Sequence, residues 1–227
     1  VNLPCKVVQC DEIWSFVYSK EKNVPEEKQG EFGYGDVYTW TAIDADSKLV
    51  PSFYVGRRDL QSARIFIGDL AERLASRVQL TTDGLKAYVQ AVEDAFGCEI
   101  GFAQLVKIYG NDKEKNGETR YSPAVCRGAS KEVVAGMPSH SNVSTSYVER
   151  QNLTMRMSMR RFTRLTNGFS KKIENHYCAI ALYFMYYNFA RPHMSLKNPY
   201  PRTPAMAAGV DNKVWSIEDI VSLINSN

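Results

Sequence analysis

The stretch VVQCDEIWSFV, residues 7–17, decides the fold because it joins the features of a buried strand to an acidic side chain. Its β-branched and aromatic residues are those that pack well on a pleated, buried surface. Asp11 stands in the middle of the stretch, and an unpaired charge is expensive to bury. We therefore expect something positive to lie opposite Asp11.

Two further acids lie beside predicted elements far along the chain. Asp83 ends the stretch VQLTTD, residues 78–83, and Gly84 follows at once, which is typical of a strand that enters a turn. Glu149 lies in the first turn of a long helical segment, whose free backbone amides can be capped by the hydroxyl groups of residues 144–146. Folding can thus bring together three acids that are distant in sequence.

The order of predicted elements is that of a ribonuclease-H-like α/β fold, in which a mixed five-stranded sheet is flanked by helices. Apolar and alternating stretches predict strands at residues 7–17, 37–43, 49–55, 78–83 and 100–109. Helical spacing predicts helices at residues 59–77, 85–96, from 146 onward and 173–189.

One boundary, between a main domain and a C-terminal tail, follows from this pattern. We expect residues 1–190 to form the main domain, with a long loop at 110–142, where Gly, Pro and Ser recur without a period. Residues 191–227 are expected to form a helical tail, with helices at 204–208 and 216–224, packed on the same domain. The chain begins with Val1, so we also expect it to be part of a longer protein with a further N-terminal module.

Composition favours an ordinary globular protein of the cytoplasm. Hydrophobic residues make up 44% of the chain and charged residues 23%, and no stretch approaches the roughly 20 apolar residues of a membrane span. We therefore expect a cytoplasmic, nucleoid-associated protein without a membrane partner. The five cysteines are odd in number and scattered, which favours free thiols, although a zinc site with Cys5, Cys10, Cys126 or His140 stays an alternative.

Basic residues are concentrated in one segment, which predicts a polyanionic partner. Residues 144–173 hold seven basic residues and one acid, and the rest of the chain holds 21 basic and 24 acidic residues. Glu149, Asn152, Arg156 and Arg160 follow spacings of three and four, so one helix face would carry them toward a phosphate backbone. The predicted DNA contacts are Arg150, Asn152, Arg156, Arg160, Arg161, Arg164, Lys171 and Lys172. The alternative is a solvated basic face, and His193 is equally open between a DNA contact and a surface turn.

The three acids have the chemistry of a divalent-metal site. Carboxylate oxygens are the ligands that Mg²⁺ and Mn²⁺ prefer, and two such ions can promote displacement at a phosphodiester. The first and fourth predicted strands are neighbours in this fold, which brings Asp11 and Asp83 together, and Glu149 can point to the same place. We expect Asp11 to bridge two Mg²⁺ (or Mn²⁺) ions, with Asp83 and Glu149 holding one each. Glu12 points to the opposite strand face and is expected to lie outside the site.

The local sequences around these acids resemble a known family. The blocks are CDEIWSFV at 10–17, TDGLKAY at 82–88, SYVERQN at 146–152, RRF at 160–162, YNFARPHMSL at 187–196 and TPAMAAG at 203–209. In this order they resemble bacterial insertion-sequence transposases of the Asp-Asp-Glu class, nearest the insertion-sequence-one type, within the retroviral-integrase and ribonuclease-H-like superfamily.

This resemblance implies a transposase catalytic domain that cuts DNA and transfers the freed 3′-hydroxyl to a target strand. It also implies that Asp11, Asp83 and Glu149 are catalytic metal ligands, and that the partners are transposon ends, target DNA and further copies of the chain in a synaptic complex. Full-length members carry an N-terminal zinc-finger or helix-turn-helix region that recognises the ends, and none is visible in this sequence. Two alternatives stay open, namely a stand-alone nuclease of the same fold and a catalytically silent DNA-binding remnant.

Overall fold

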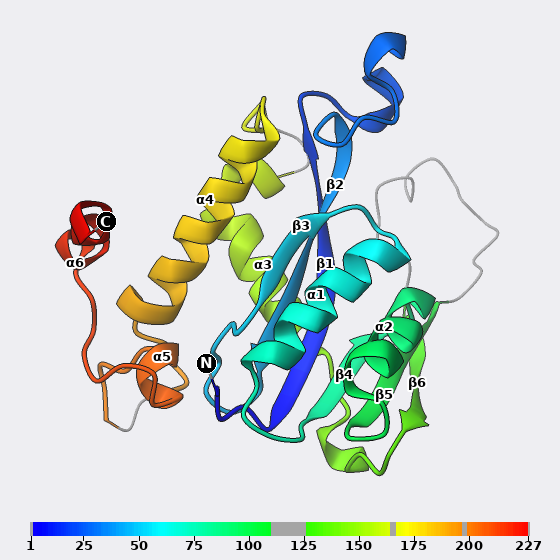
Figure 1. Ribbon diagram of the computed structural model, residues 1–227, viewed down its shortest axis with the longest axis vertical. Helices are drawn as coiled ribbons and strands as arrows, with labels where there is room; N and C mark the ends of the chain where they lie inside the picture. Colours follow the sequence, from blue (N-terminus) through cyan, green and yellow to red (C-terminus); the bar gives the residue numbers. More distant parts are fainter. Residues whose placement is uncertain (1, 110–125, 164–166, 197–198, 227) are drawn as a thin grey trace.

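The chain forms an α/β fold around one six-stranded sheet, seen in a computed structural model that describes residues 2–109, 126–163, 167–196 and 199–226 (Figure 1). The strands are β1 (Val7–Val17), β2 (Gly35–Asp44), β3 (Phe53–Gly56), β4 (Gln79–Asp83), β5 (Gly101–Tyr109) and β6 (Cys126–Ala135). The α-helices are α1 (Leu60–Arg73), α2 (Lys86–Phe96), α3 (Ser146–Ser158), α4 (Ile173–Met185), α5 (Pro204–Ala207) and α6 (Ile217–Ser222).

The sheet is mixed, with strand order β3-β2-β1-β4-β5-β6. β1 pairs with β2 antiparallel and with β4 parallel, β4 pairs with β5 parallel, and β6 pairs with β5 antiparallel. This arrangement is compatible with the ribonuclease-H-like fold, so the predicted fold class is confirmed. The predicted number of strands was too small by one.

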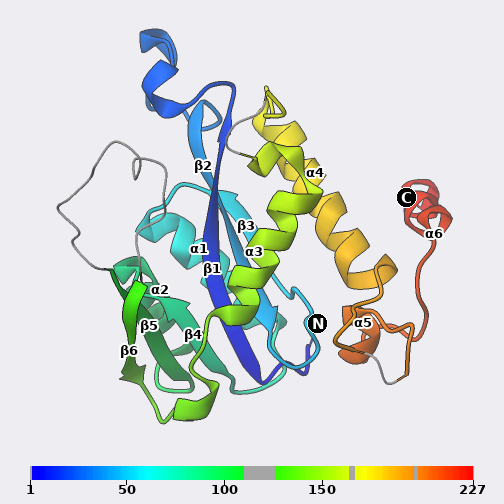
Figure 2. The same cartoon turned by 180° about the vertical axis from the view of Figure 1, so that it is seen from behind.

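Helices cover both faces of β1, which explains its nearly continuous apolar sequence. Val8 and Cys10 pack in a core layer with α1 and α2, whereas Ile13 and Val17 pack in a second layer with α3 and α4. Figures 1 and 2 show these two layers from opposite sides, with α1 and α2 in front in the first view and α3 in front in the second. Asp11 therefore belongs to the face that α3 covers.

The missed strand, β6, lies inside the segment predicted to be a loop. Its residues are mostly exposed, and it is an edge strand that pairs with β5 alone. Without a buried face it has no apolar alternation, so the sequence carries no period-two signal. Residues 110–125 of the same predicted loop lie outside the described residues.

Strand β3 is shorter than the predicted strand at 49–55. It begins at Phe53, two residues after Pro51, and a proline has no backbone N–H to donate to a strand ladder. The connection before it is instead held by Asn188, whose side-chain amide donates to the Val50 carbonyl oxygen at 2.9 Å and whose side-chain oxygen accepts from the Val50 N–H at 3.0 Å. Asn188 lies in a π-helical turn, Tyr186–Ala190, that continues α4.

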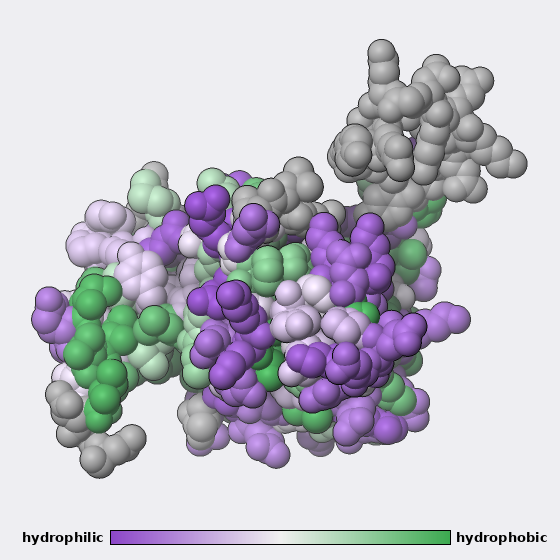
Figure 3. Space-filling view, turned by 90° about the horizontal axis from the view of Figure 1, so that it is seen from above, coloured by the Kyte–Doolittle hydropathy of each residue, from purple (hydrophilic) through white to green (hydrophobic). Residues whose placement is uncertain are grey.

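The C-terminal tail packs on the main domain through α5, whereas α6 exposes apolar side chains to solvent. Ala205 of α5 is buried in the layer formed with α1 and α2, and Trp215 packs on Phe189 with ring centres 4.7 Å apart. Beyond this contact Ile217 and Val221 of α6 are more than half exposed. Figure 3 shows apolar side chains gathered over α6 at the left of the view.

All five cysteines are free thiols, as predicted, with Cys5 and Cys10 buried. None of the helices in the described part of the chain has the length and apolar character to cross a membrane. Among the described residues, the group of side chains able to hold a metal ion contains no cysteine or histidine, which leaves the zinc alternative without support.

A buried histidine connects β1 to α4. His176 is fully buried, with Ser15 Oγ 3.1 Å from its Nε2 and Ser170 Oγ 3.0 Å from its Nδ1. Arg161 donates to Ser170 and thus joins the same network. Burial, followed by the nearby Arg161 charge, lowers the pKa of His176 to about 4.

We expect His176 to make the protein less stable in mild acid. Because the folded-state pKa is below the unfolded value of about 6.5, the unfolded chain binds the proton first as the pH falls. The stability that neutral His176 contributes is fully present above about pH 6.5. It is lost as the pH falls through about 4, and the free energy of unfolding then decreases by up to about 3 kcal/mol for the pKa shift of His176.

Urea unfolding at pH 7.5 and 4.5 measures this effect. The His176→Gln variant should be less stable at pH 7.5 but should lose less stability on acidification than the wild type. His140→Gln, which changes an exposed histidine, is the control. An equal loss on acidification in all three proteins would contradict the assignment.

Candidate functional site

The sheet topology brings Asp11 and Asp83 to one place. Parallel pairing of β1 with β4 runs from Val7–Gln79 to Cys10–Thr82, so Asp11 and Asp83 are the next residues on the two strands. The adjacent strands β1 and β4 lie at the point from which the sheet extends in two directions, toward β2 on one side and toward β5 on the other. In open α/β sheets the crevice outside the carboxyl ends of the strands at such a point is the usual ligand site.

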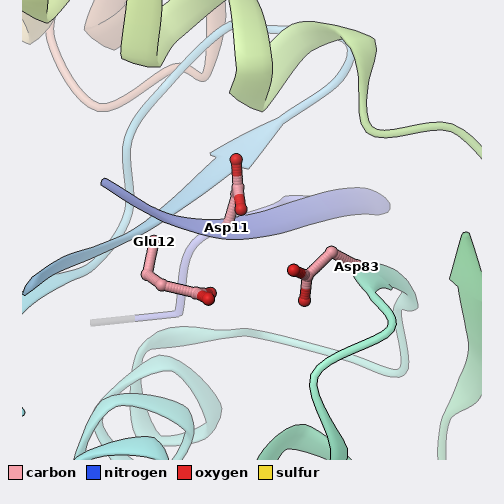
Figure 4. Close-up of side chains that lie close together, drawn as sticks. All are labelled: Asp11, Glu12 and Asp83. Atoms are coloured by element: carbon pink, nitrogen blue, oxygen red, sulfur yellow. The ribbon is translucent and has the colours of Figure 1, made fainter. Parts of the chain in front are cut away.

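Three carboxylates form a close cluster there. Oxygens of Asp11, Glu12 and Asp83 lie within 4.8 Å of one another. Figure 4 shows Asp83 pointing back toward β1 from the end of β4, where it meets the side chains of Asp11 and Glu12. The expectation that Glu12 lies outside the site is wrong. The side chains of Asp11 and Glu12 do point to opposite faces of β1. Because β4 ends at this point, however, no neighbouring strand lies between the two side chains on that edge of β1.

The cluster concentrates negative charge in a poorly solvated place. Burial, followed by repulsion from Glu12 and Asp83, raises the pKa of Asp11 to about 7. Burial and then Asp83 raise the pKa of Glu12 to about 7, although Arg58 and Tyr88 oppose this shift. Arg58 Nε donates to Glu12 at 2.6 Å, and the Tyr88 hydroxyl donates to its other oxygen at 3.2 Å. Arg58 is thus a positive partner of the kind expected beside β1, although it pairs with Glu12 and, at 3.7 Å, with Asp83 rather than with Asp11.

Glu149 lines the same cleft as Asp11 and Asp83 but stands apart from the close cluster. The cleft has a volume of about 650 Å³. The Glu149 carboxylate accepts a hydrogen bond from the Thr145 hydroxyl and forms an ion pair with Lys107 Nζ at 2.7 Å. The structure therefore brings all three predicted ligands to one cleft, with Glu149 held by a lysine.

Strand β1 also fixes the start of α3. The side-chain oxygen of Gln9 accepts hydrogen bonds from the backbone N–H groups of Tyr147 at 2.8 Å and Val148 at 3.2 Å. Gln9 thereby satisfies two of the free amides at the helix start, and the Ser144 hydroxyl accepts from the Ser146 N–H at 3.2 Å, a role that the sequence suggested for the hydroxyl residues at 144–146. Gln9 is two residues before Asp11, so the same strand positions the first predicted ligand and the helix that carries the third.

Asn152 acts on Asp11 and is not an exposed DNA contact. It is buried, and its side-chain amide donates to Asp11 Oδ2 at 2.8 Å. Its side-chain oxygen is also buried and has no hydrogen-bond partner within the described residues. This contact holds the Asp11 carboxylate in place, as residues behind a metal ligand commonly do.

The cluster fits a hard divalent cation. Asp11 and Asp83 supply carboxylate oxygens at a shared point, with Glu12 beside them and Glu149 across the cleft. Such oxygens are the preferred ligands of Mg²⁺ and Mn²⁺. A bound cation would also relieve the repulsion that, after burial, raises the pKa values of Asp11 and Glu12.

The predicted basic residues do not form one stripe. Helix α3 ends at Ser158, so Arg156 belongs to it but Arg160 does not; Arg160 begins a separate 3₁₀ turn after extended backbone at Met159. The guanidinium of Arg161 is tied to Ser170 in the network around His176.

The other predicted basic residues are distributed around α3 and α4. Arg150 is exposed and lines a second pocket, away from the acidic cleft. Lys171 and Lys172 are exposed just before α4. Arg164 lies outside the described residues.

Three other cations line the acidic cleft. Arg58 lies in the connection between β3 and α1, Lys86 begins α2, and Lys107 belongs to β5. The sequence did not single them out, because each is isolated in a segment of mixed charge. Lys86 follows Asp83, the last residue of a predicted strand, by three residues. This position was the signal in the sequence that could have placed Lys86 at the cleft.

Comparison of the chain with protein-family models and with curated proteins finds no match. The resemblance to insertion-sequence transposases therefore stays an expectation.

We expect Asp83→Asn to stabilise the protein when divalent ions are absent. Removing this charge relieves the repulsion on Asp11 and Glu12 at neutral pH, and each kcal/mol gained should raise the melting temperature by roughly 2–4 °C. Millimolar Mg²⁺ should raise the melting temperature of the wild type, because a ligand that binds the folded state stabilises it, but not that of Asp83→Asn.

Thermal unfolding with EDTA and with Mg²⁺ checks both effects. Asp46→Asn, in an exposed turn, removes one acid elsewhere and should respond to Mg²⁺ as the wild type does. An undiminished response in Asp83→Asn would show that Asp83 does not hold the cation.

Proposed function

We propose that this chain is the catalytic domain of a DNA transposase of the Asp-Asp-Glu class, which cleaves a DNA strand and transfers the 3′-hydroxyl to a target. The observation that carries the proposal is the meeting of Asp11, in the middle of β1, with Asp83 at the end of the adjacent parallel strand β4, with Glu149 lining the same cleft. The resemblance of the three sequence blocks supports the choice of reaction.

The residues of the cleft have complementary tasks in this proposal. Asp11 and Asp83 would hold the divalent ions, Mg²⁺ or Mn²⁺, and Glu12 and Glu149 are the candidates for further ligands. When bound, two such ions supply an activated oxygen nucleophile and a stabilised leaving oxygen. Lys86 and Lys107 line the cleft beside the acids and would contact the non-reacting oxygens of the phosphate.

The ion pair between Glu149 and Lys107 has a direct consequence for this function. In the pair each side chain neutralises the other, so Glu149 is engaged as long as Lys107 holds it. A phosphate that enters the cleft offers Lys107 a second anionic partner. Substrate binding would then release Glu149 toward Asp11 and Asp83.

The proposed partners are transposon ends, target DNA and further copies of this chain in a synaptic complex. Such an enzyme works on DNA in the cytoplasm, in association with the nucleoid. The basic residues at Arg156, Arg160, Lys171 and Lys172 would contact the DNA backbone, which positions DNA without reading its sequence.

We expect Asp11→Asn and Asp83→Asn each to lower Mg²⁺-dependent cleavage and joining by on the order of 10³-fold, about 4 kcal/mol of transition-state stabilisation. Glu149→Gln should act in the same direction. Asp46→Asn, the exposed control, should retain activity. The measurement is gel analysis of labelled DNA incubated with purified protein, and undiminished joining by Asp83→Asn would refute the ligand assignment.

The products of the same assay separate the alternatives. Joined strands identify a transposase, whereas shortened strands alone identify a nuclease of the same fold. A DNA-binding remnant would give neither product, would not respond to Mg²⁺ in thermal unfolding, and would still bind DNA with an affinity that falls with salt. The Glu149–Lys107 pair is the observation that favours this last alternative, because it leaves Glu149 engaged.

A further inference from the structure

A second cavity, with a volume of about 190 Å³, lies on the other side of α3 from the acidic cleft. We call it the basic pocket, after the lining residues Lys48, Tyr147, Arg150, Tyr187, Arg191 and His193. They come from the turn after β2, from α3, and from the end of α4 with the segment that follows it. None of the described residues that line the pocket is acidic.

Lys48 is the most unusual member of the basic pocket, because its charge is buried without a carboxylate. Only 8% of the residue is exposed, its Nζ donates to the Ala45 carbonyl oxygen, and it stands 3.5 Å from the centre of the Tyr147 ring. Within the described residues no carboxylate lies within 4.0 Å of it. Burying an unpaired charge is costly, and an anion in the pocket would compensate it.

The backbone of Lys48 adds a second cost. Its φ is +63°, a left-handed conformation that favours glycine or asparagine and costs other residues energy. A glycine would relieve this strain, yet the position carries a long cationic side chain. Strain of this kind commonly persists where a side chain has a task.

The other cations of the pocket have the same unpaired character. Arg150 and Arg191 are exposed, and in the part of the chain that the structure describes neither forms an ion pair with an acid. His193 lines the same pocket, and its Nδ1 accepts from the Ser195 N–H at 3.3 Å, so that Nε2 can carry the proton. Burial, followed by Lys48 and Arg191, lowers the pKa of His193, which indicates a positive field in the pocket.

The pocket is held in shape by contacts beneath it. The Tyr187 hydroxyl donates to the Lys48 carbonyl oxygen at 3.1 Å, and the adjacent Asn188 pairs with both backbone groups of Val50. These bonds join the end of α4 to the turn after β2, from which Lys48 projects. A preformed site binds its ligand without the entropic cost of ordering these elements.

Residues of α3, the helix in front in Figure 2, line both the basic pocket and the acidic cleft. Tyr147, Arg150 and Thr154 face the pocket, whereas Glu149 faces the cleft, so the two sites flank one helix. The diameter of a helix with its side chains is about 10–12 Å, which corresponds to the rise of roughly three base pairs along the axis of a duplex.

We propose that the basic pocket binds a backbone phosphate of the same nucleic-acid strand that enters the acidic cleft. The inference rests on the proposed function for the path of the strand, and it adds a phosphate-binding site on the far side of α3. Lys48, Arg150, Arg191 and His193 supply the donors, and the partly exposed ring of Tyr147 offers a surface on which a neighbouring base can stack.

The test is DNA binding in EDTA, where cleavage does not contribute. Arg150→Gln/Arg191→Gln removes two exposed charges, and Lys6→Gln/Lys22→Gln removes two exposed charges elsewhere as the matched control. Fluorescence anisotropy with labelled single-stranded and duplex DNA is measured over a range of salt concentrations. Loss of one phosphate contact should lower the affinity of the first variant about tenfold and reduce the slope of log affinity against log salt by about 0.7–0.9. The control should keep the wild-type slope.

Two results would overturn the inference. One is equal affinity and slope in the two double variants. The other is an unchanged DNA affinity in Arg150→Gln/Arg191→Gln together with thermal stabilisation by inorganic phosphate in the wild type alone, which would assign the pocket to a free anion. The Mg²⁺-dependent joining assay tests the proposed function separately. If wild-type protein bound DNA through the pocket but joined no strands, the proposed function would be refuted and the inferred phosphate-binding site would still stand.

Discussion

The fold depends on how a central strand accommodates two consecutive carboxylates. Helices cover both faces of β1, yet it carries Asp11 on one face and Glu12 on the other. Each acid has a polar partner supplied by the layer it faces, Asn152 for Asp11, and Arg58 with Tyr88 for Glu12. These partners do not offset the effects of burial and of repulsion between the acids, which together raise the pKa values of both acids to about 7. The excess of negative charge on β1 destabilises the fold, and a cation bound at the proposed site would offset this cost.

Much of this arrangement could be predicted from the sequence, because periodicity reports which face of an element is buried. The stretches ending at Val17 and Asp83 were recognised as strands, and their neighbouring positions followed from the order of elements. The missed strand β6 has no buried face and therefore no pattern. Glu12 was misplaced because alternation along β1 describes the strand but not the point at which its neighbour β4 ends.

The basic residues were harder to interpret, since charge in a sequence does not reveal what a side chain contacts. Arg161 belongs to a buried polar network around His176, and Asn152 holds Asp11. Conversely, Lys48 and Arg191 lie outside the basic segment, and folding brings them to Arg150. Side chains from separate segments form both the acidic cleft and the basic pocket, so neither site has a continuous sequence signature.

The cap that Gln9 places on α3 limits how Glu149 can move. The start of the helix is bonded to β1 two residues before Asp11, so a sliding helix would break both amide bonds to Gln9. In the proposed function, Glu149 would therefore approach Asp11 by rotation of its side chain after its ion pair with Lys107 has dissociated. Rotamer changes take picoseconds to nanoseconds, whereas collective helix movements take microseconds to milliseconds. In the proposed function, a slow step would then arise from the arrival or departure of DNA, and not from assembly of the acidic cleft.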